Sequence, residues 1–252
     1  MPLNAITFDL WDTIILDGSD EPKRAARGLQ SKHEERRSLF WRKLKNQASI
    51  DKSITDAAFD VHEAAFRQVW YGMSVTWEVP ERLEVLLAGL DRKLPKSTYD
   101  ELVHQLETME LVAKPDLVPG AAETIAELAD RYDLCIVSDT IYTPGRGLWA
   151  LLEHHDIAKH FKGFIFSDQV GRSKPHPDCF RGAAEQLGSD FSKMLHIGDR
   201  DAKDIVGAQA VGMKAILFTG ARDEGSREIT SADAVIDNFS DLVSAIDKIA
   251  AI

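Results

Sequence analysis

Ile6-Thr7-Phe8-Asp9-Leu10-Trp11-Asp12-Thr13 begins as a short apolar run and continues into a carboxylate. Such a run predicts a buried strand with Asp9 at its C-terminal tip. In open parallel α/β sheets, ligands bind beyond the carboxyl ends of the strands. The segment therefore places Asp9 as a nucleophile, and Thr13, four residues later, as a hydroxyl that orients it.

Three further segments carry polar groups at comparable places. Ser138 and Asp139 follow the apolar pair Ile136-Val137, and Lys174 lies in the loop Arg172-Ser173-Lys174-Pro175. Asp199 ends His196-Ile197-Gly198-Asp199, and Asp204 stands five residues later. Taken singly, these residues have ordinary explanations as a turn serine, a solvated lysine, a helix N-cap and an acid in a first helical turn.

The C-terminal half of the chain alternates between strand and helix patterns. Short β-rich runs occur at residues 134–137, 163–166, 194–197, 214–218 and 234–236, and apolar residues recur at helical spacing over residues 121–131 and 202–211. This alternation predicts an α/β fold with a parallel sheet and right-handed crossovers. We assign residues 1–16 and 115–252 to this core.

Residues 17–114 show no convincing strand and several helical stretches. Phe59, His62 and Phe66 recur at helical spacing after Thr55, which we expect to be the N-cap of that helix. The chain returns to the core through residues 114–120, where two prolines and a glycine mark a linker. The pattern predicts a helical insertion between the first two strands.

In order and spacing, the four polar segments resemble the haloacid dehalogenase-like hydrolase superfamily. The resemblance spans almost the whole chain and implies a Rossmann-like core with the helical insertion as a cap. It also implies that Asp9 attacks phosphorus and forms an aspartyl-phosphate, that the hydroxyl of Ser138 contacts a phosphoryl oxygen, and that Lys174 offsets the charge. The expected substrate is a small phosphorylated metabolite.

The same segments predict a magnesium site. Asp9 and Asp199, with Asp204 directly or through water, offer the carboxylate oxygens that Mg²⁺ prefers. The resemblance adds the backbone carbonyl of Trp11 as a further ligand.

Trp11 departs from the family pattern, in which an Asp at this position is the general acid and base. Asp12 stands one residue later, and we interpret it as a turn residue or as a replacement acid and base. Three alternatives stay open. A dehalogenase carries an aromatic residue here and needs no metal, a phosphonatase-like enzyme needs a lysine from the cap, and a non-catalytic phosphate sensor or interaction module needs no acid. The lysines open to the second role are Lys23, Lys32, Lys43 and Lys45.

Composition and net charge limit which binding partners and which cellular compartment we expect. A formal net charge of −11 disfavours nucleic acid, because affinity for the phosphate backbone comes from Lys and Arg. Cys135 and Cys179 are the two cysteines, which fits a reducing compartment, and the sequence has no apolar run long enough to span a membrane. We therefore expect a cytoplasmic protein, and nothing in the sequence indicates its oligomeric state. Nine basic residues between Lys23 and Lys45 predict a solvated helical face and leave open whether one or two arginines reach an anionic substrate.

Overall fold

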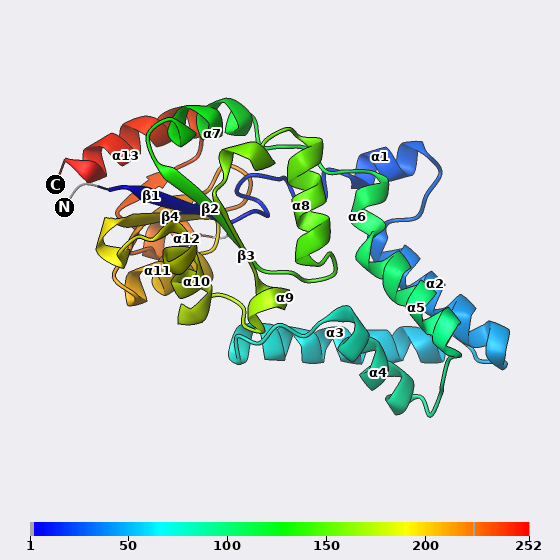
Figure 1. Cartoon of the computed structure of the whole chain (residues 1–252). Helices are drawn as coiled ribbons and strands as arrows, with labels where there is room; N and C mark the ends of the chain where they lie inside the picture. Colours follow the sequence, from blue (N-terminus) through cyan, green and yellow to red (C-terminus); the bar gives the residue numbers. More distant parts are fainter. Residues whose placement is uncertain (1–2, 224, 252) are drawn as a thin grey trace.

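The computed structural model describes residues 3–223 and 225–251 and is built around one parallel sheet of six strands. The strand order is β3-β2-β1-β4-β5-β6, so the chain runs outward on one side of β1 and then crosses to the other side (Figure 1). The α/β fold expected from the sequence is confirmed. The strands are β1 (Ala5–Phe8), β2 (Asp133–Ser138), β3 (Gly163–Phe166), β4 (Met194–Gly198), β5 (Lys214–Phe218) and β6 (Ala234–Ile236).

The sheet is buried on both faces because its side chains alternate between two apolar clusters. In β1, Ile6 and Phe8 join one cluster, and Ala5 joins the other. In β2, Leu134 and Ile136 share the first cluster, whereas the next residues along the strand enter the second. This period of two is why central strands of a parallel sheet are apolar almost throughout.

Helices cover both faces of the sheet. Figure 1 shows α7 and α13 on one side and α10 and α11 on the other. Apolar residues of α7, α8 and α13 complete the first cluster, and those of α10 and α11 complete the second. The core helices are α7 (Ala121–Ala129), α8 (Gly145–His154), α9 (Ser167–Val170), α10 (Pro177–Leu187), α11 (Val206–Ala210), α12 (Ser226–Ile229) and α13 (Leu242–Ala250), with 3-10 turns at Ala158–His160, Phe191–Lys193 and Phe239–Asp241.

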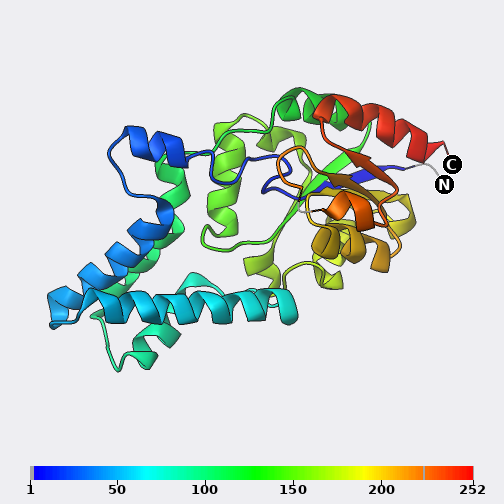
Figure 2. The ribbon, with the colours of Figure 1, turned by 180° about the vertical axis from the view of Figure 1, so that it is seen from behind.

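Between β1 and β2 the described chain forms helices, which extend to one side of the sheet (Figure 2). They pack around a third apolar cluster that includes Phe40, Phe59, Leu83 and Leu102. We call residues 17–114 the helical insertion. Its helices are α1 (Glu21–Ala26), α2 (Lys32–Gln47), α3 (Lys52–Gly72), α4 (Val79–Gly89), α5 (Lys96–Glu107) and α6 (Met109–Val112).

The start of α3 differs from the sequence expectation. Its N-cap is Asp51, whose side chain accepts a hydrogen bond from the N–H of Ser53, and Thr55 lies inside the first turn. Both residue types are good N-caps, and the structure selects the earlier one. The buried stripe of Phe59, His62 and Phe66 is as expected.

The helical insertion leaves and re-enters the core at adjacent points. Ile15 and Leu117 form an antiparallel bridge, and Leu16 N–H donates to the carbonyl of Asp116 at 2.9 Å. Val118 N–H donates in turn to the carbonyl of Ile14 at 2.8 Å. The two connections therefore form a short two-stranded ribbon beneath the helices.

The expected helix over residues 202–211 is not regular. Residues Asp201–Ile205 form a π-helical turn, and the α-helix proper, α11, begins only at Val206. Such turns insert an extra residue into the helix and are frequent at functional sites. Within the described chain, no helix is both long enough and apolar enough to cross a bilayer.

Candidate active site

Three carboxylates meet at the carboxyl edge of the sheet. Asp9 directly follows β1, Asp199 directly follows β4, and Asp204 lies on the π-helical turn after β4. One oxygen from each lies within 4.8 Å of the other two, and all three side chains are buried. Because strand order reverses between β1 and β4, this is the crevice where ligands bind in doubly wound sheets.

Lys174 joins two of these carboxylates. Its Nζ lies 2.5 Å from Oδ1 of Asp9 and 2.6 Å from Oδ1 of Asp204. Burial lowers the pKa of the Lys174 ammonium, but Asp204 and Asp9 outweigh that effect and hold the pKa above its usual range. The lysine is therefore a fixed positive charge, held between the expected nucleophile and an expected metal ligand.

Asp204 is fully hydrogen-bonded. Besides Lys174, its Oδ1 lies 3.2 Å from Nε2 of His196, and its Oδ2 accepts from the N–H of Arg200 at 2.9 Å. The other ring nitrogen of His196 lies 2.8 Å from Oγ1 of Thr7. Burial raises the pKa of Asp204, but Lys174 and His196 prevail and hold it below its usual range. The backbone approaches closely here, since a Cβ on Gly198 would lie 2.3 Å from Cγ of Asp204.

Asp199 differs from Asp204 in its hydrogen bonding. Both of its carboxylate oxygens are buried without a hydrogen-bond partner among the described residues. Burial, with added repulsion from Asp9 and Asp204, raises its pKa to about 8. A buried carboxylate without a donor is unfavourable unless a cation meets it. The nearest cation to Asp199 among the described residues is Nε of Arg200, 3.8 Å from Oδ2 and beyond hydrogen-bond distance. Oxygens without a hydrogen bond beside two more carboxylates are the donor set that Mg²⁺ prefers, so these residues fit such an ion.

Asp9 is held by the sheet and by Thr13. Its N–H donates to the carbonyl of Ile197 at 2.8 Å, and Oγ1 of Thr13 donates to its Oδ2 at 3.3 Å. Burial raises the pKa of Asp9 to about 6 against the opposing effect of Lys174. Thr13 therefore lies where the sequence places an orienting hydroxyl.

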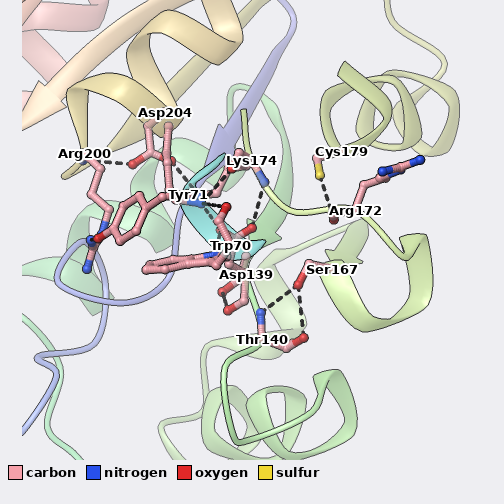
Figure 3. A network of polar contacts seen from close by, with 12 residues as sticks. Trp70, Tyr71, Asp139, Thr140, Ser167, Arg172, Lys174, Cys179, Arg200 and Asp204 are labelled. Carbon is pink, nitrogen blue, oxygen red and sulfur yellow. Dashed lines mark hydrogen bonds and ion pairs between the residues drawn. The ribbon is translucent and has the colours of Figure 1, made fainter. Parts of the chain in front are cut away.

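Ser138 ends β2, beside β1, and is buried. Its hydroxyl donates to the carbonyl of Asp139 at 3.3 Å. Asp139, which the sequence placed at a strand end without a role, links two segments: its Oδ1 accepts from the N–H of Lys174 at 2.9 Å, and its Oδ2 from the indole N–H of Trp70 at 2.8 Å (Figure 3). The available signal was its place directly after Ser138 at a strand end.

The side chains of Trp11 and Asp12 lie in different surroundings. Trp11 lines the cavity above Asp9, whereas Asp12 is not among the described residues that line it. Asp12 has a φ of 55°, its Oδ1 accepts from the N–H of Asp17 at 3.0 Å, and its Oδ2 lies 4.0 Å from Arg222. This position favours the turn interpretation, and any role in proton transfer stays a prediction.

The cavity has a volume of about 360 Å³ and lies between the sheet edge and the helical insertion. Of the four lysines considered for a phosphonatase, Lys32 lines it, and its Nζ donates to Asp20 at 2.8 Å. Arg36 is the insertion arginine that reaches it. The lining residues are Asp9, Trp11, Asp17, Gly18, Glu21, Lys32, His33, Arg36, Trp70, Glu110, Asp139, Ile141, Tyr142, Thr143, Lys174, Arg200, Lys203 and Asp204.

Several known proteins are similar to this chain in sequence or in fold. The phosphoglycolate phosphatase of Escherichia coli O157:H7 is 33% identical over 188 residues, which are 69% of this chain and 71% of that protein. The glyceraldehyde 3-phosphate phosphatase of Pyrococcus abyssi (strain GE5 / Orsay) is 36% identical over 102 residues, 40% of this chain and 42% of that protein. In fold, the crystal structure of a HAD phosphatase from Thermococcus onnurineus aligns with a TM-score of 0.64 and 22% identity, over 96% of this chain and 97% of that one.

A family model for haloacid dehalogenase-like hydrolases matches residues 3–212, which include β1 to β4 and all of the carboxylates described above. The chain therefore belongs to the haloacid dehalogenase-like hydrolase family.

Proposed function

We propose that this hydrolase is a Mg²⁺-dependent phosphatase of small phosphorylated metabolites that works through an aspartyl-phosphate on Asp9. The observation that supports the proposal is the buried carboxylate of Asp199, which has no hydrogen bond among the described residues and lies beside Asp9 and Asp204. Lys174 contacts only two of the three converging carboxylates, Asp9 and Asp204, and a bound divalent cation would offset the charge that the lysine leaves uncompensated. The phosphatase names of two relatives support the same reaction.

In the proposed reaction, one oxygen of Asp9 attacks phosphorus, and the alcohol of the substrate leaves. Thr13 donates to Oδ2 of Asp9 and Lys174 lies at Oδ1, so these contacts fix the orientation of the carboxylate before attack. Lys174 also offsets the negative charge that gathers when a phosphoryl group approaches Asp9. Bound Mg²⁺ would add further positive charge for the phosphoryl oxygens. Water then hydrolyses the aspartyl-phosphate, and Ser138 stays a proposed phosphoryl contact.

The acid and base of this reaction is the missing part, because Trp11 cannot transfer a proton. We therefore expect the enzyme to turn over aryl phosphates, whose leaving groups are weak bases, faster than alkyl phosphates such as its proposed natural substrates. The alternative function, a dehalogenase, is supported by the aromatic side chain of Trp11 in the cavity wall.

We further propose that residues 1–16 and 115–252 form the catalytic core and that the helical insertion is a cap that selects the substrate. In the cap, Lys32 and Arg36 are paired with carboxylates: Lys32 lies 2.8 Å from Asp20 and 3.8 Å from both Asp17 and Glu110, and Arg36 lies 3.0 Å from Glu110. Two basic residues thus face three acids, which leaves no net positive charge for a second anion.

Arg36 also lines the cavity, and its Nη2 donates to Glu110. We propose that another N–H of its guanidinium donates to a hydroxyl or carbonyl oxygen of the substrate. A phosphorylated polyol or sugar meets this requirement better than a phosphorylated carboxylate does. The free, buried Cys135 and Cys179 suit a reducing compartment, and we propose the cytoplasm as the site of action.

The test of the proposed function is phosphate release from an aryl phosphate in Mg²⁺ and in excess chelator. We expect turnover in Mg²⁺ only, and loss of turnover in Asp9→Asn, which keeps the shape of the side chain but is a poor nucleophile. Asp130→Asn, an exposed acid at the end of α7, is the matched control. Halide release from a 2-haloacid in chelator, without phosphate release in Mg²⁺, would establish the dehalogenase instead.

The substrate class is tested separately by comparing glycerol phosphate with phosphoglycolate. We expect a higher kcat/KM for glycerol phosphate, and we expect Arg36→Met to raise the KM for glycerol phosphate more than for an aryl phosphate. A clear preference for phosphoglycolate would show that the paired charges of the cap rearrange around a carboxylate.

A further inference from the structure

We propose that Trp70, near the end of α3, is a positioning residue for Lys174: it closes a buried polar cluster that fixes the lysine beside Asp9. The helical insertion would then set the catalytic lysine as well as choose the substrate. The proposal rests on the role of Lys174 in the proposed function. Trp70, Asp139 and Lys174 of this cluster are shown in Figure 3.

The peptide groups on both sides of Lys174 are held by one ion pair. Oδ1 of Asp139 accepts from the N–H of Lys174 at 2.9 Å, and Nζ of Lys203 donates to the Lys174 carbonyl at 2.8 Å. Nζ of Lys203 also lies 3.2 Å from Oδ2 of Asp139. Because the backbone of Lys174 is pinned at both its N–H and its carbonyl, the direction of its side chain depends on this pair.

Trp70 covers that ion pair from the helical insertion. Its indole N–H donates to Oδ2 of Asp139 at 2.8 Å, the same oxygen that Lys203 contacts. Its ring centroid lies 3.9 Å from Nζ of Lys203, and its own carbonyl accepts from that ammonium at 3.4 Å. A cation over an indole face is stabilised most when water is excluded, and Trp70 is only 8% exposed.

A second contact ties the Lys174 loop to the same part of the insertion. The N–H of Ser173 donates to the carbonyl of Ser74 at 3.0 Å, and Val75 forms an antiparallel bridge with Arg172. The residues just after α3 therefore pair with the two residues just before the catalytic lysine. The side chain of Trp70 and the backbone of Ser74 and Val75 therefore both hold the Lys174 loop from the helical insertion.

Without Trp70, water would reach Asp139 and Lys203. Their attraction weakens as the effective dielectric constant rises, and each group gains water as an alternative partner. The peptide groups of Lys174 would then lose the rigid anchor that directs its side chain. A displacement of about 1 Å at a catalytic group can reduce the rate by about 10²-fold.

The main experiment measures kcat and KM for a small aryl phosphate in Trp70→Ala and Trp70→Phe. We expect kcat to fall by about 10- to 100-fold in Trp70→Ala and KM for the small aryl phosphate to change much less, because the variant disturbs the lysine more than it disturbs the cavity wall that Trp70 lines. Trp70→Phe keeps the ring cover and loses the N–H, so its kcat should lie between wild type and Trp70→Ala. Trp41→Phe is the matched control, since the indole of Trp41 donates to the carbonyl of Ile50 inside the insertion. An unchanged kcat in a folded Trp70→Ala protein would overturn the proposal, as would an equal loss in Trp41→Phe.

A double-mutant cycle separates this role from simple loss of packing. If Trp70 acts through Asp139, then Trp70→Phe should reduce kcat in the wild-type background and have almost no further effect on Asp139→Asn. Losses that multiply in the double variant would mean that Trp70 acts by another route.

A substrate-free readout distinguishes failure of this proposal from failure of the proposed function. Reductive methylation followed by mass spectrometry reports how open the Lys174 amine is, and in wild type the side chain is 3% exposed. We expect methylation of Lys174 to be at least tenfold faster in Trp70→Ala than in wild type or Trp41→Phe. If the wild-type protein releases no phosphate, this rate alone decides, and equal rates in all three proteins would refute the role of Trp70.

Discussion

Nζ of Lys174 lies 2.5 Å from Oδ1 of Asp9, and the two side chains are only 3% and 9% exposed. A buried ion pair of this kind is a poor source of net stability, but removal of one partner is expensive because the other charge stays buried. Asp204, on the other side of the same ammonium, makes the dependence stronger.

Lys174→Met is therefore expected to destabilise the metal-free protein by about 3–5 kcal/mol, because it leaves Asp9 and Asp204 without their common cation. Added Mg²⁺ should restore part of the loss, since the same carboxylates then meet another cation. Urea unfolding in chelator and in Mg²⁺ measures both effects. An unfolding free energy that Lys174→Met leaves unchanged in chelator would contradict the charge balance described for the site.

Asp199→Asn and Asp204→Asn should have opposite effects on the metal-free protein. Burial raises the pKa of Asp199 to about 8, so its folded form binds a proton that the unfolded chain has already released, and stability falls as pH rises towards 8. We expect Asp199→Asn to be more stable than wild type in chelator at pH 8.5 by at least about 1 kcal/mol. Asp204→Asn breaks contacts with Lys174 and His196 and should be less stable.

The same two variants test the metal site. Asp199→Asn should remove most of the rise in Tm that Mg²⁺ gives to wild type, and calorimetric titration should rank its loss of Mg²⁺ affinity above that of Asp204→Asn. Unchanged Mg²⁺ affinity in both variants would mean that Asp199 and Asp204 do not bind the metal and only stand at the start of the helix that follows β4.

Trp11→Asp should raise turnover of alkyl phosphates much more than turnover of aryl phosphates. Trp11 lines the cavity, so a carboxylic acid at this position can reach the leaving group, and protonation matters only for poor leaving groups. The gain is bounded by the roughly 10²- to 10⁴-fold typical of general acid–base catalysis. Equal rates on alkyl phosphates before and after the change, in a folded protein that binds Mg²⁺, would point to Asp12 or to a reaction other than ester hydrolysis.

The lowered pKa of His62 predicts a pH dependence of the unfolding free energy that does not involve the active-site residues. Burial and the neighbouring Arg82 lower its pKa from 6.5 to about 4, and Nε of Arg82 donates to Nε2 of the neutral ring at 3.2 Å. The unfolded chain therefore takes up a proton first as pH falls, and stability is lost between pH 6.5 and about 4.

His62→Gln should flatten that part of the stability curve, by up to about 1.4 kcal/mol per pH unit. Chemical unfolding at several pH values measures the slope, and His104→Gln, an exposed histidine on α5, is the control. A variant slope equal to that of wild type would show that His62 does not set this dependence.

The sequence predicted the sheet and the placement of Asp9 and Asp199, because residues that directly follow parallel strands meet at one edge. Lys174 lies in a loop after α9, and the family resemblance, not the strand pattern, indicated that it belongs to the site. The sequence did not predict Trp70 or Lys203. Their roles depend on how the helical insertion sits against the sheet, and no local pattern encodes that placement. The role of Asp12 was undecided for a similar reason, because the direction of its side chain depends on the positive φ that its backbone adopts in one turn.

The bridge between Ile15 and Leu117 joins the two ends of the helical insertion to each other. Backbone hydrogen bonds pair the two connections with each other, and Ser19 and Lys23 of the helical insertion add contacts to Asp116. A different block of sequence can therefore be joined at the same two points without disturbing the sheet. A chimaera cut at these two points would keep the sheet but exchange Trp70 and Ser74, so its new insertion must supply its own contacts to the loop of Lys174.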